Sequence, residues 1–304
     1  MLESLLTEQR NPASTEIDRL STEEMLRVMN DEDAKVATAV RAELPNIARA
    51  VDAIADALAS GGRLFYIGAG TSGRLGVLDA SECPPTFNVP PDLIQGVIAG
   101  GLPALVRASE GSEDDPIAGW KDLLDRGFRE RDVVCGIATS GRTPYVVGAI
   151  YEARKHGAKT IGLSCTPGSE LGTAAEIAIT PLPGPEVITG STRMKAGTAT
   201  KLVLNMLSTG VMIRLGYVFS NLMVNVQPTN EKLRDRARRI VRDACGISDE
   251  EAARALGAAD RQVAPAIVMV KTGLNAESAR ELLAQSRGRV FEALERASAG
   301  IGNG

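Results

Sequence analysis

Histidine, aromatic residues and paired cysteines are scarce in this 304-residue chain, and each shortage excludes a class of function. His156 is the only histidine and the four cysteines form no Cys-x-x-Cys pair, so the sequence encodes neither a Cys/His zinc site nor a disulfide framework. We therefore expect reduced, mostly buried thiols and no metal. Aromatic residues make up 3% of the chain, which leaves few side chains on which single-stranded bases stack.

A basic surplus and a long apolar run are also missing. The net charge is -4, so neither nucleic acid nor an anionic membrane is an expected partner. The apolar region 202–218 is interrupted by Asn205 and Arg214, whereas a bilayer span needs about 20 apolar residues. The first residues show no basic segment followed by an apolar run. These absences predict a soluble, cytoplasmic protein.

The apolar residues follow two successive patterns. Up to about Ser60 they recur at helical spacing, and Ser21 with Glu24 has the form of a capping box. Short apolar runs then alternate with helical patterns, which is typical of βαβ units and a parallel sheet. The predicted strands are 64–67, 93–99, 133–138, 160–163 and 176–180, and the predicted helices among them are 116–125, 144–156 and 192–214.

The strand patterns cease beyond Asn230. Four further helices are predicted there, over 231–244, 248–256, 262–270 and 276–285. The chain is therefore expected to have three parts: a helical lead-in of residues 1–60 that packs on the next part, a sheet-bearing domain of residues 61–230, and a helical domain of residues 231–304.

The loop of residues 68–74, Gly-Ala-Gly-Thr-Ser-Gly-Arg, follows the first predicted strand and opens a helix near Gly73. Ligands of open parallel sheets bind outside the carboxyl ends of the strands, where helix N-termini present free N–H groups to anions. Gly70, Thr71 and Ser72 are therefore candidate phosphate-binding residues. The loop also matches the Gly-x-Gly-x-x-Gly dinucleotide motif, so a nicotinamide-dependent dehydrogenase is the rival interpretation, although a lone match is weak.

A second loop of the same chemistry, Thr-Ser-Gly-Arg-Thr-Pro at residues 139–144, follows the third predicted strand. Its candidate substrate-binding residues are Thr139, Ser140, Gly141 and Thr143. Two such loops suit one compact phosphate group held from both sides, which argues against the dehydrogenase. Either loop alone is equally well explained as a turn that favours glycine and serine.

The segment 184–195 precedes the long predicted helix and supplies the remaining candidates, Glu186 and Ser191. Ser191 and Thr192 are expected first of all to cap that helix. Contact with the sugar is the second interpretation of both Ser191 and Thr192, and Glu186 is a candidate for binding a substrate hydroxyl or assisting ring opening.

The two loops and the segment 184–195 resemble the sugar isomerase (SIS) domain. The stretches 6–12, 68–74, 79–85 and 225–230 resemble motifs of the N-acetylmuramic acid 6-phosphate etherase family. The resemblance to this family extends over nearly the whole chain. The resemblance implies an α/β fold with a flavodoxin-like five-stranded parallel sheet flanked by helices, and a small all-helical C-terminal domain similar to a ubiquitin-associated fold. It also implies a homodimer with the site near its interface.

The activity that this resemblance implies is cleavage of the D-lactyl ether of N-acetylmuramic acid 6-phosphate, a phosphorylated amino sugar, by water. The products are N-acetylglucosamine 6-phosphate and D-lactate, and the reaction serves cell-wall sugar recycling. Glu82 matches the family's catalytic acid and Glu113 its second catalytic carboxylate. Pattern alone describes both as ordinary solvated side chains. Pro84 and Pro85 are expected to end the helix that carries Glu82 and to hold Glu82 near the strand-end rim.

Two carboxylates satisfy the chemistry. Opening the sugar ring exposes an aldehyde at C1, which acidifies the C2 proton and permits elimination of the lactyl oxygen from C3. The reaction needs one base and one acid, with roles reversed when water adds, and it needs no cofactor. Two other functions stay open: a non-catalytic phosphosugar sensor, such as the regulator of glucokinase, and an aldose-ketose isomerase.

Overall fold

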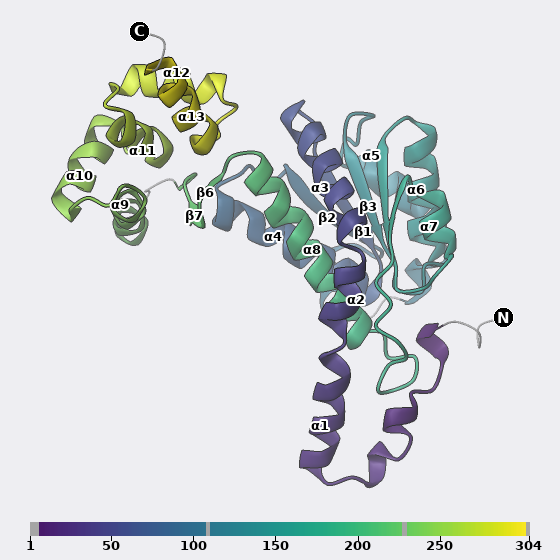
Figure 1. Ribbon diagram of the computed structural model, residues 1–304. Helices are drawn as coiled ribbons and strands as arrows, with labels where there is room; N and C mark the ends of the chain where they lie inside the picture. Colours follow the sequence, from purple (N-terminus) through teal and green to yellow (C-terminus); the bar gives the residue numbers. More distant parts are fainter. Residues whose placement is uncertain (1–5, 108–109, 227–229, 302–304) are drawn as a thin grey trace. The chain divides into compact units, whose positions relative to one another are not determined.

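The computed structural model describes residues 6–107, 110–226 and 230–301 (Figure 1). The chain divides into two compact units, Met1–Cys83 with Pro90–Ser208 and Pro84–Val89 with Thr209–Gly304. The expected division at residues 60 and 230 stays a prediction. Gln227, Pro228 and Thr229, part of the fourth stretch that carries the family resemblance, lie outside the described residues.

The first unit contains a five-stranded sheet in the order β2-β1-β3-β4-β5. All four pairings are parallel, which confirms the flavodoxin-like sheet. The central strands are buried along their whole length, as expected of a parallel sheet covered on both faces. The strands are β1 (Leu64–Gly68), β2 (Ile94–Ile98), β3 (Val133–Ile137), β4 (Lys159–Leu163) and β5 (Ile177–Ile179), each at a predicted position.

Helices flank this sheet. α5, α6 and α7 cover one face of the sheet (Figure 1). On that face Leu123, Val146 and Ile150 pack in one hydrophobic cluster with Phe65 and Val134. The bounds are α4 (Gly70–Phe87), α5 (Ala118–Asp125), α6 (Pro144–Lys155), α7 (Glu170–Ala174) and α8 (Lys195–Arg214).

The N-terminal lead-in is helical, as predicted. It consists of the short 3-10 helices η2 (Leu6–Glu8), η3 (Pro12–Ser14) and η4 (Ile17–Arg19), followed by α1 (Thr22–Asp33), α2 (Val36–Ala42) and α3 (Leu44–Ala59). The predicted capping box is confirmed, because the Ser21 N–H donates to Glu24 Oε2 at 3.0 Å and the Glu24 N–H donates to Ser21 Oγ at 3.4 Å. α3 contacts β5 at the edge of the sheet.

The prediction that Pro84 and Pro85 end α4 is wrong. The helix continues to Phe87, and Asn88, with a φ of 53°, follows it. The fixed φ of proline is compatible with a helix, so the two prolines remove hydrogen bonds to the preceding turn without stopping the chain from turning.

The second unit is largely helical. Five helices lie within residues 230–301: α9 (Glu231–Cys245), α10 (Asp249–Ala258), α11 (Val263–Thr272), α12 (Ala276–Gln285) and α13 (Val290–Ile301). The first four were predicted. α13 was missed, as was the hairpin of β6 (Val218–Phe219) and β7 (Leu222–Met223), whose two-residue strands are too short to show a period. Of the helices in the described ranges, none has the length and apolar composition of a bilayer span.

Candidate functional site

A cavity of about 220 Å³ lies at the carboxyl ends of β1 and β3. These two strands are neighbours, and the chain leaves them toward opposite edges of the sheet, so the cavity lies at the topological switch point. It contains most of the predicted site. The predicted residues that line it are Gly70, Thr71, Ser72, Glu113, Thr139, Ser140 and Thr143.

The first loop enters α4 directly after β1. Gly70 has a φ of +50°, which glycine adopts without strain, and the Gly73 N–H donates to the Ala69 carbonyl at 3.0 Å. The first N–H groups of α4 have no partner within the helix and lie at the cavity end of the helix. Ser72 is buried and Thr71 half-buried, so both the hydroxyl groups and the helix N-terminus are in place to bind an anion.

Backbone hydrogen bonds from residues 165 and 171 fix the second loop. The Cys165 N–H donates to the Thr139 carbonyl and the Leu171 N–H to the Gly141 carbonyl, each at 2.9 Å. Thr143 is the N-cap residue of α6, but its side chain makes no capping hydrogen bond. Among the described residues, the Ser140 hydroxyl has one hydrogen-bond contact, a long one of 3.4 Å from the Arg142 N–H. Both hydroxyl groups therefore remain available to a ligand.

Gly141 does not line the cavity, and its role is to let the loop pack closely. Its φ is +68°, and a Cβ atom there would lie 2.2 Å from Ser169 Cβ. Ser169 is itself held as the N-cap of α7, because its hydroxyl accepts from the Gly172 N–H at 3.1 Å. A larger residue at 141 must therefore displace either the loop or α7.

We expect Gly141→Ala to lower the free energy of unfolding by roughly 2–5 kcal/mol, from left-handed strain and overpacking together. Gly168→Ala is the matched control: its φ is +60° and nothing lies within 4 Å of the added Cβ, so only the strain of about 1–2 kcal/mol applies. Urea unfolding of both variants measures the difference. Equal losses would show that the contact with Ser169 relaxes freely.

Glu113 lies beside the first loop, next to Gly70. It follows the 3-10 helix η6 (Glu110–Ser112) and is half-buried, and its carbonyl accepts from the Tyr145 N–H at 3.0 Å, at the start of α6. Its Oε1 atom lies 3.4 Å from the position that a Cβ on Gly70 would take. The neighbouring Asp115 accepts from the Ile117 N–H at 2.8 Å and from the Ala118 N–H at 3.2 Å just before α5, whose N-cap position is Ile117.

Glu82 lies elsewhere, and the prediction that it sits near the strand-end rim is wrong for a single chain. It is an exposed residue of α4 and does not line the cavity. A helix that follows a strand runs back along the sheet, and residue 82 is twelve positions beyond residue 70, or about 18 Å along the axis. One chain therefore does not bring Glu82 to Glu113.

Glu186 is a buried capping residue rather than a lining residue. It is 1% exposed, and its two carboxylate oxygens accept from the N–H groups of Lys195 and Ala196 at 2.9 Å each. Burial raises the pKa of Glu186 despite these two hydrogen bonds. The expectation that Ser191 and Thr192 cap α8 is therefore wrong, since the helix begins later and its cap is supplied by Glu186.

The C-terminal part of the segment 184–195 does reach the cavity. Gly190 and Thr192 line it, whereas Ser191 does not. The place of Thr192 in the cavity fits the second interpretation given for it, contact with the sugar, rather than the first, which was capping.

Comparison with known proteins identifies the family. The model for the N-terminal SIS domain of glucokinase regulatory protein matches residues 46–154, and the SIS domain model matches residues 124–210. Proteins named N-acetylmuramic acid 6-phosphate etherase from Yersinia pestis (strain Pestoides F) and Yersinia pseudotuberculosis serotype O:1b (strain IP 31758) are each 57% identical over 293 residues, 96% of this chain and 99% of theirs. The chain belongs to the N-acetylmuramic acid 6-phosphate etherase family.

Solved structures agree with the fold of this etherase-family chain. A phosphoheptose isomerase from Francisella tularensis superposes with a TM-score of 0.51 at 20% identity, over 63% of this chain and 98% of that one. At that identity the likeness concerns the fold alone.

Glu8 lines the etherase-family cavity and was missed by sequence reasoning. It ends the 3-10 helix η2, and its Oε2 atom lies 3.3 Å from the position that a Cβ on Gly190 would take. The stretch 6–12 carried part of the family resemblance, but no role was attached to it. Its position in the cavity depends on contacts with residues more than 170 positions away, which no local pattern reveals.

These contacts join the N-terminal segment to the segment 184–195. Asn11 Nδ2 donates to the Pro185 carbonyl at 3.0 Å, and the Ser14 hydroxyl donates to the Val187 carbonyl at 2.7 Å. Lys195 Nζ, 1% exposed, pairs with Glu32 Oε2 at 2.5 Å. Although burial alone would raise it, hydrogen bonds from Lys195, Lys35 and Asn11 lower the pKa of Glu32 to about 2.

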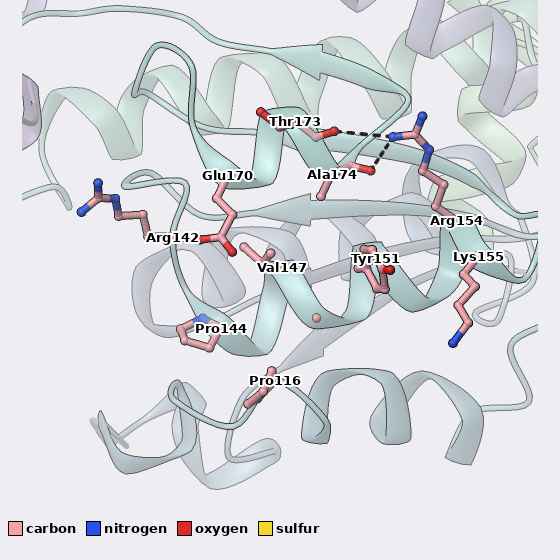
Figure 2. A pocket seen from close by; sticks show the side chains of 11 residues that line it. Pro116, Arg142, Pro144, Val147, Tyr151, Arg154, Lys155, Glu170, Thr173 and Ala174 are labelled. Atoms are coloured by element: carbon pink, nitrogen blue, oxygen red, sulfur yellow. Dashed lines mark hydrogen bonds between the residues drawn. The ribbon is translucent and has the colours of Figure 1, made fainter.

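A larger groove of about 880 Å³ lies on the other side of the second loop, between α6 and α7 (Figure 2). Tyr151 is 62% exposed there. The Arg154 guanidinium donates to the carbonyls of Thr173 and Ala174, so one of its N–H groups is already engaged within the protein. Among the described residues that line the groove, Glu170 is the one carboxylate and the hydroxyl groups belong to Tyr151 and Thr173, and no serine or threonine of the two loops lines it. The smaller cavity is therefore the better candidate for the site.

In the part of the chain that the structure describes, no three His, Cys, Asp or Glu side chains are grouped so as to hold a metal ion. The chemistry that the cavity itself offers is hydrogen bonding by hydroxyl and N–H groups, and proton transfer by carboxylates.

Proposed function

We propose that this chain cleaves the D-lactyl ether of N-acetylmuramic acid 6-phosphate with water, giving N-acetylglucosamine 6-phosphate and D-lactate. It would thus act as a carbon-oxygen lyase of cell-wall sugar recycling. The observation that carries the proposal is the cavity at the switch point, where hydroxyl groups from two loops and Glu113 meet in a member of the etherase family.

The phosphate is the part of the substrate that the two loops would bind. The cavity is lined by the hydroxyl groups of Thr71, Ser72, Ser140 and Thr143. α4 and α6 both begin beside it. Hydrogen bonds from hydroxyl and N–H groups to a charged acceptor are stronger than those between neutral groups. The helix dipoles favour negative charge at the same place.

Glu113 would act at C2 of the sugar. With the ring open, the Glu113 carboxylate takes the C2 proton, the electrons move toward the C1 carbonyl, and the bond from C3 to the lactyl oxygen breaks as an acid protonates that oxygen. Water then adds at C3 and a proton returns to C2. Incubation in water labelled with ¹⁸O tests this course, because the label must appear at C3 of the product sugar and not in D-lactate.

The acid would come from a second copy of the chain. Glu113 lines the cavity, but Glu82 of the same chain is about 18 Å further along α4 and exposed. A two-fold homodimer that brings the partner subunit's Glu82 to the cavity would complete the acid-base pair twice, once per site, because two-fold contacts are reciprocal.

A regulator that binds phosphosugars without cleaving them is the second candidate, and the match of residues 46–154 to the SIS domain of glucokinase regulatory protein favours it specifically. An isomerase would share ring opening and C2 deprotonation. Release of D-lactate by the purified protein separates the etherase from both alternatives, because neither a regulator nor an isomerase forms it.

We expect Ser140→Ala to raise KM for the phosphorylated substrate about ten- to a hundredfold, since a hydrogen bond to a charged group contributes about 1.5–3 kcal/mol. Ser60→Ala is the control, because the exposed Ser60 hydroxyl donates to the Asp56 carbonyl at the end of α3 and Ser60 does not line the cavity. Steady-state kinetics measures both. An unchanged KM and kcat in Ser140→Ala would remove this residue from the phosphate site.

A further inference from the structure

The cavity contains a second carboxylate from the same chain, that of Glu8. Among the described residues, its Oε1 atom receives only a long contact of 3.4 Å from the Thr7 hydroxyl, and its Oε2 atom has no hydrogen bond or ion pair. Oε2 faces Gly190, where the absence of a side chain leaves it room. Among the described residues the Thr7 hydroxyl is thus the one donor to Glu8, and the Oε2 atom in the wall of the cavity is left to accept from a ligand.

Buried polar contacts fix this wall. Asn11 is 6% exposed and Glu32 4%, and Asn11 Nδ2 donates both to the Pro185 carbonyl and to Glu32 Oε2. Glu32 in turn pairs with Lys195 at the start of α8. Breaking such buried contacts is costly, so the segment that carries Glu8 is anchored three residues away from it.

The size and charge of the cavity limit what Glu8 can do. At about 220 Å³ it is smaller than the ~300–1000 Å³ of sites for drug-sized ligands, so Glu8 and Glu113 both lie within reach of one bound sugar. A carboxylate repels the phosphate that the two loops attract, and that repulsion is offset where the carboxylate accepts hydrogen bonds from sugar hydroxyl groups. Glu8 therefore suits the hydroxyl-bearing end of the substrate.

The proposed function also needs a group that opens the sugar ring, a step separate from the roles given to Glu113 and Glu82, because the substrate is a closed ring and elimination requires the open aldehyde. Ring opening moves one proton between two oxygens bonded to the same carbon, the C1 hydroxyl and the ring oxygen O5. A single carboxylate, whose two oxygens are likewise bonded to one carbon, can take the first proton and deliver one to the second.

We propose, on the basis of the proposed function, that Glu8 is the catalytic residue that opens the sugar ring. Its carboxylate takes the proton of the C1 hydroxyl, the bond between C1 and O5 breaks with its electron pair going to O5, and Glu8 returns the proton to O5. C1 becomes the aldehyde and Glu8 ends as the carboxylate it was, so no other reactant is consumed. Glu113 then takes the C2 proton.

Exchange between the α and β anomers of the product sugar phosphate tests the assignment, because this exchange needs ring opening but neither C2 deprotonation nor ether cleavage. Wild-type protein is expected to accelerate it, as measured by exchange spectroscopy with NMR. Glu8→Gln is expected to reduce that acceleration at least about a hundredfold, the low end of the effect of removing a general acid-base group. Glu113→Gln is expected to retain it.

Glu16→Gln is the matched control, since Glu16 lies on the same N-terminal segment, is exposed and pairs with Arg19 outside the cavity. It should keep both anomer exchange and D-lactate release. Binding of the product by Glu8→Gln within about threefold of wild type shows that the cavity is intact. If Glu8→Gln binds the product more weakly than that, the variant Glu8→Asp becomes the test. It keeps the carboxylate, and it must recover anomer exchange for the proposal to stand.

The outcomes separate this proposal from the function on which it rests. Anomer exchange that persists in Glu8→Gln while wild type releases D-lactate overturns the role of Glu8 and leaves the function standing. If the wild-type protein exchanges the anomers but releases no D-lactate, the etherase function is contradicted. Ring opening by Glu8 then stands or falls with the anomer exchange of Glu8→Gln. Loss of anomer exchange in Glu113→Gln with retention in Glu8→Gln assigns ring opening to Glu113.

Discussion

A mixture of two inactive variants, Glu82→Gln and Glu113→Gln, is expected to recover roughly a quarter of wild-type D-lactate release once their subunits have exchanged. Each variant alone should fall about 10²–10⁴-fold, because each lacks one member of the acid-base pair. Random pairing makes half of the dimers mixed. In a mixed dimer one site combines an intact Glu113 with the partner subunit's Glu82, and the other site lacks both.

The control is a mixture of Glu113→Gln with Glu113→Ala, in which no site regains an intact pair and activity should stay at the level of the separate variants. Native mass spectrometry of one isotope-labelled variant verifies that subunits exchange. Exchange without recovery would show that the two glutamates do not act across an interface. A chain that stays monomeric at the assay concentration would contradict the homodimer directly.

The second large effect separates the two steps of the reaction. On the product sugar phosphate, which has no lactyl group to lose, Glu82→Gln is expected to exchange the C2 hydrogen with solvent deuterium at nearly the wild-type rate. Glu113→Gln should lose this exchange by about 10²–10⁴-fold, because it removes the base. Proton NMR of the C2 position in deuterated water follows the exchange.

Asp114→Asn is the matched control for Glu113→Gln. Asp114 is the next residue in the chain, but it is exposed and does not line the cavity, so both exchange and D-lactate release should persist. Exchange retained in Glu113→Gln and lost in Glu82→Gln would reverse the two roles. If both variants keep C2 exchange and D-lactate release, neither residue is catalytic.

The sheet and the phosphate-binding loops were predictable because their signals are local. Buried runs such as Val133–Ile137 are apolar whichever helices cover them, and a strand followed by glycine and hydroxyl residues places those residues at the carboxyl edge of a parallel sheet. Gly70, Thr71, Ser140 and Thr143 therefore meet in one cavity, as expected.

The rest of the site depends on contacts that local patterns do not encode. Ser191 and Thr192 have the right residue types for capping α8. The carboxylate of Glu186, at the other end of the same segment, nevertheless accepts the hydrogen bonds of the first N–H groups of the helix. Capping preference describes the residue type, whereas the path of the backbone decides which side chain arrives. Glu8 shows the same limit, since its position follows from the contact of Asn11 with Pro185.

The position of Glu82 shows a different limit. Family resemblance assigns it a role, and the helix that carries it could be predicted from the sequence, but the direction of that helix takes the residue away from the carboxyl edge of its own sheet. Periodicity describes one chain, so it does not say which surface a second chain covers.

The buried pair of Glu32 and Lys195 joins residues 163 positions apart, and this separation sets an order on folding. At a synthesis rate of about 5–20 residues per second, roughly 10–30 s pass after Glu32 is made before Lys195 exists. Long-range contacts of this kind form late because the loop between them must first be closed. We therefore expect the sheet to form before the N-terminal segment that carries Glu8 and Glu32 packs against the segment 184–195. A nascent chain would then contain β1 and β3 well before it has a complete cavity.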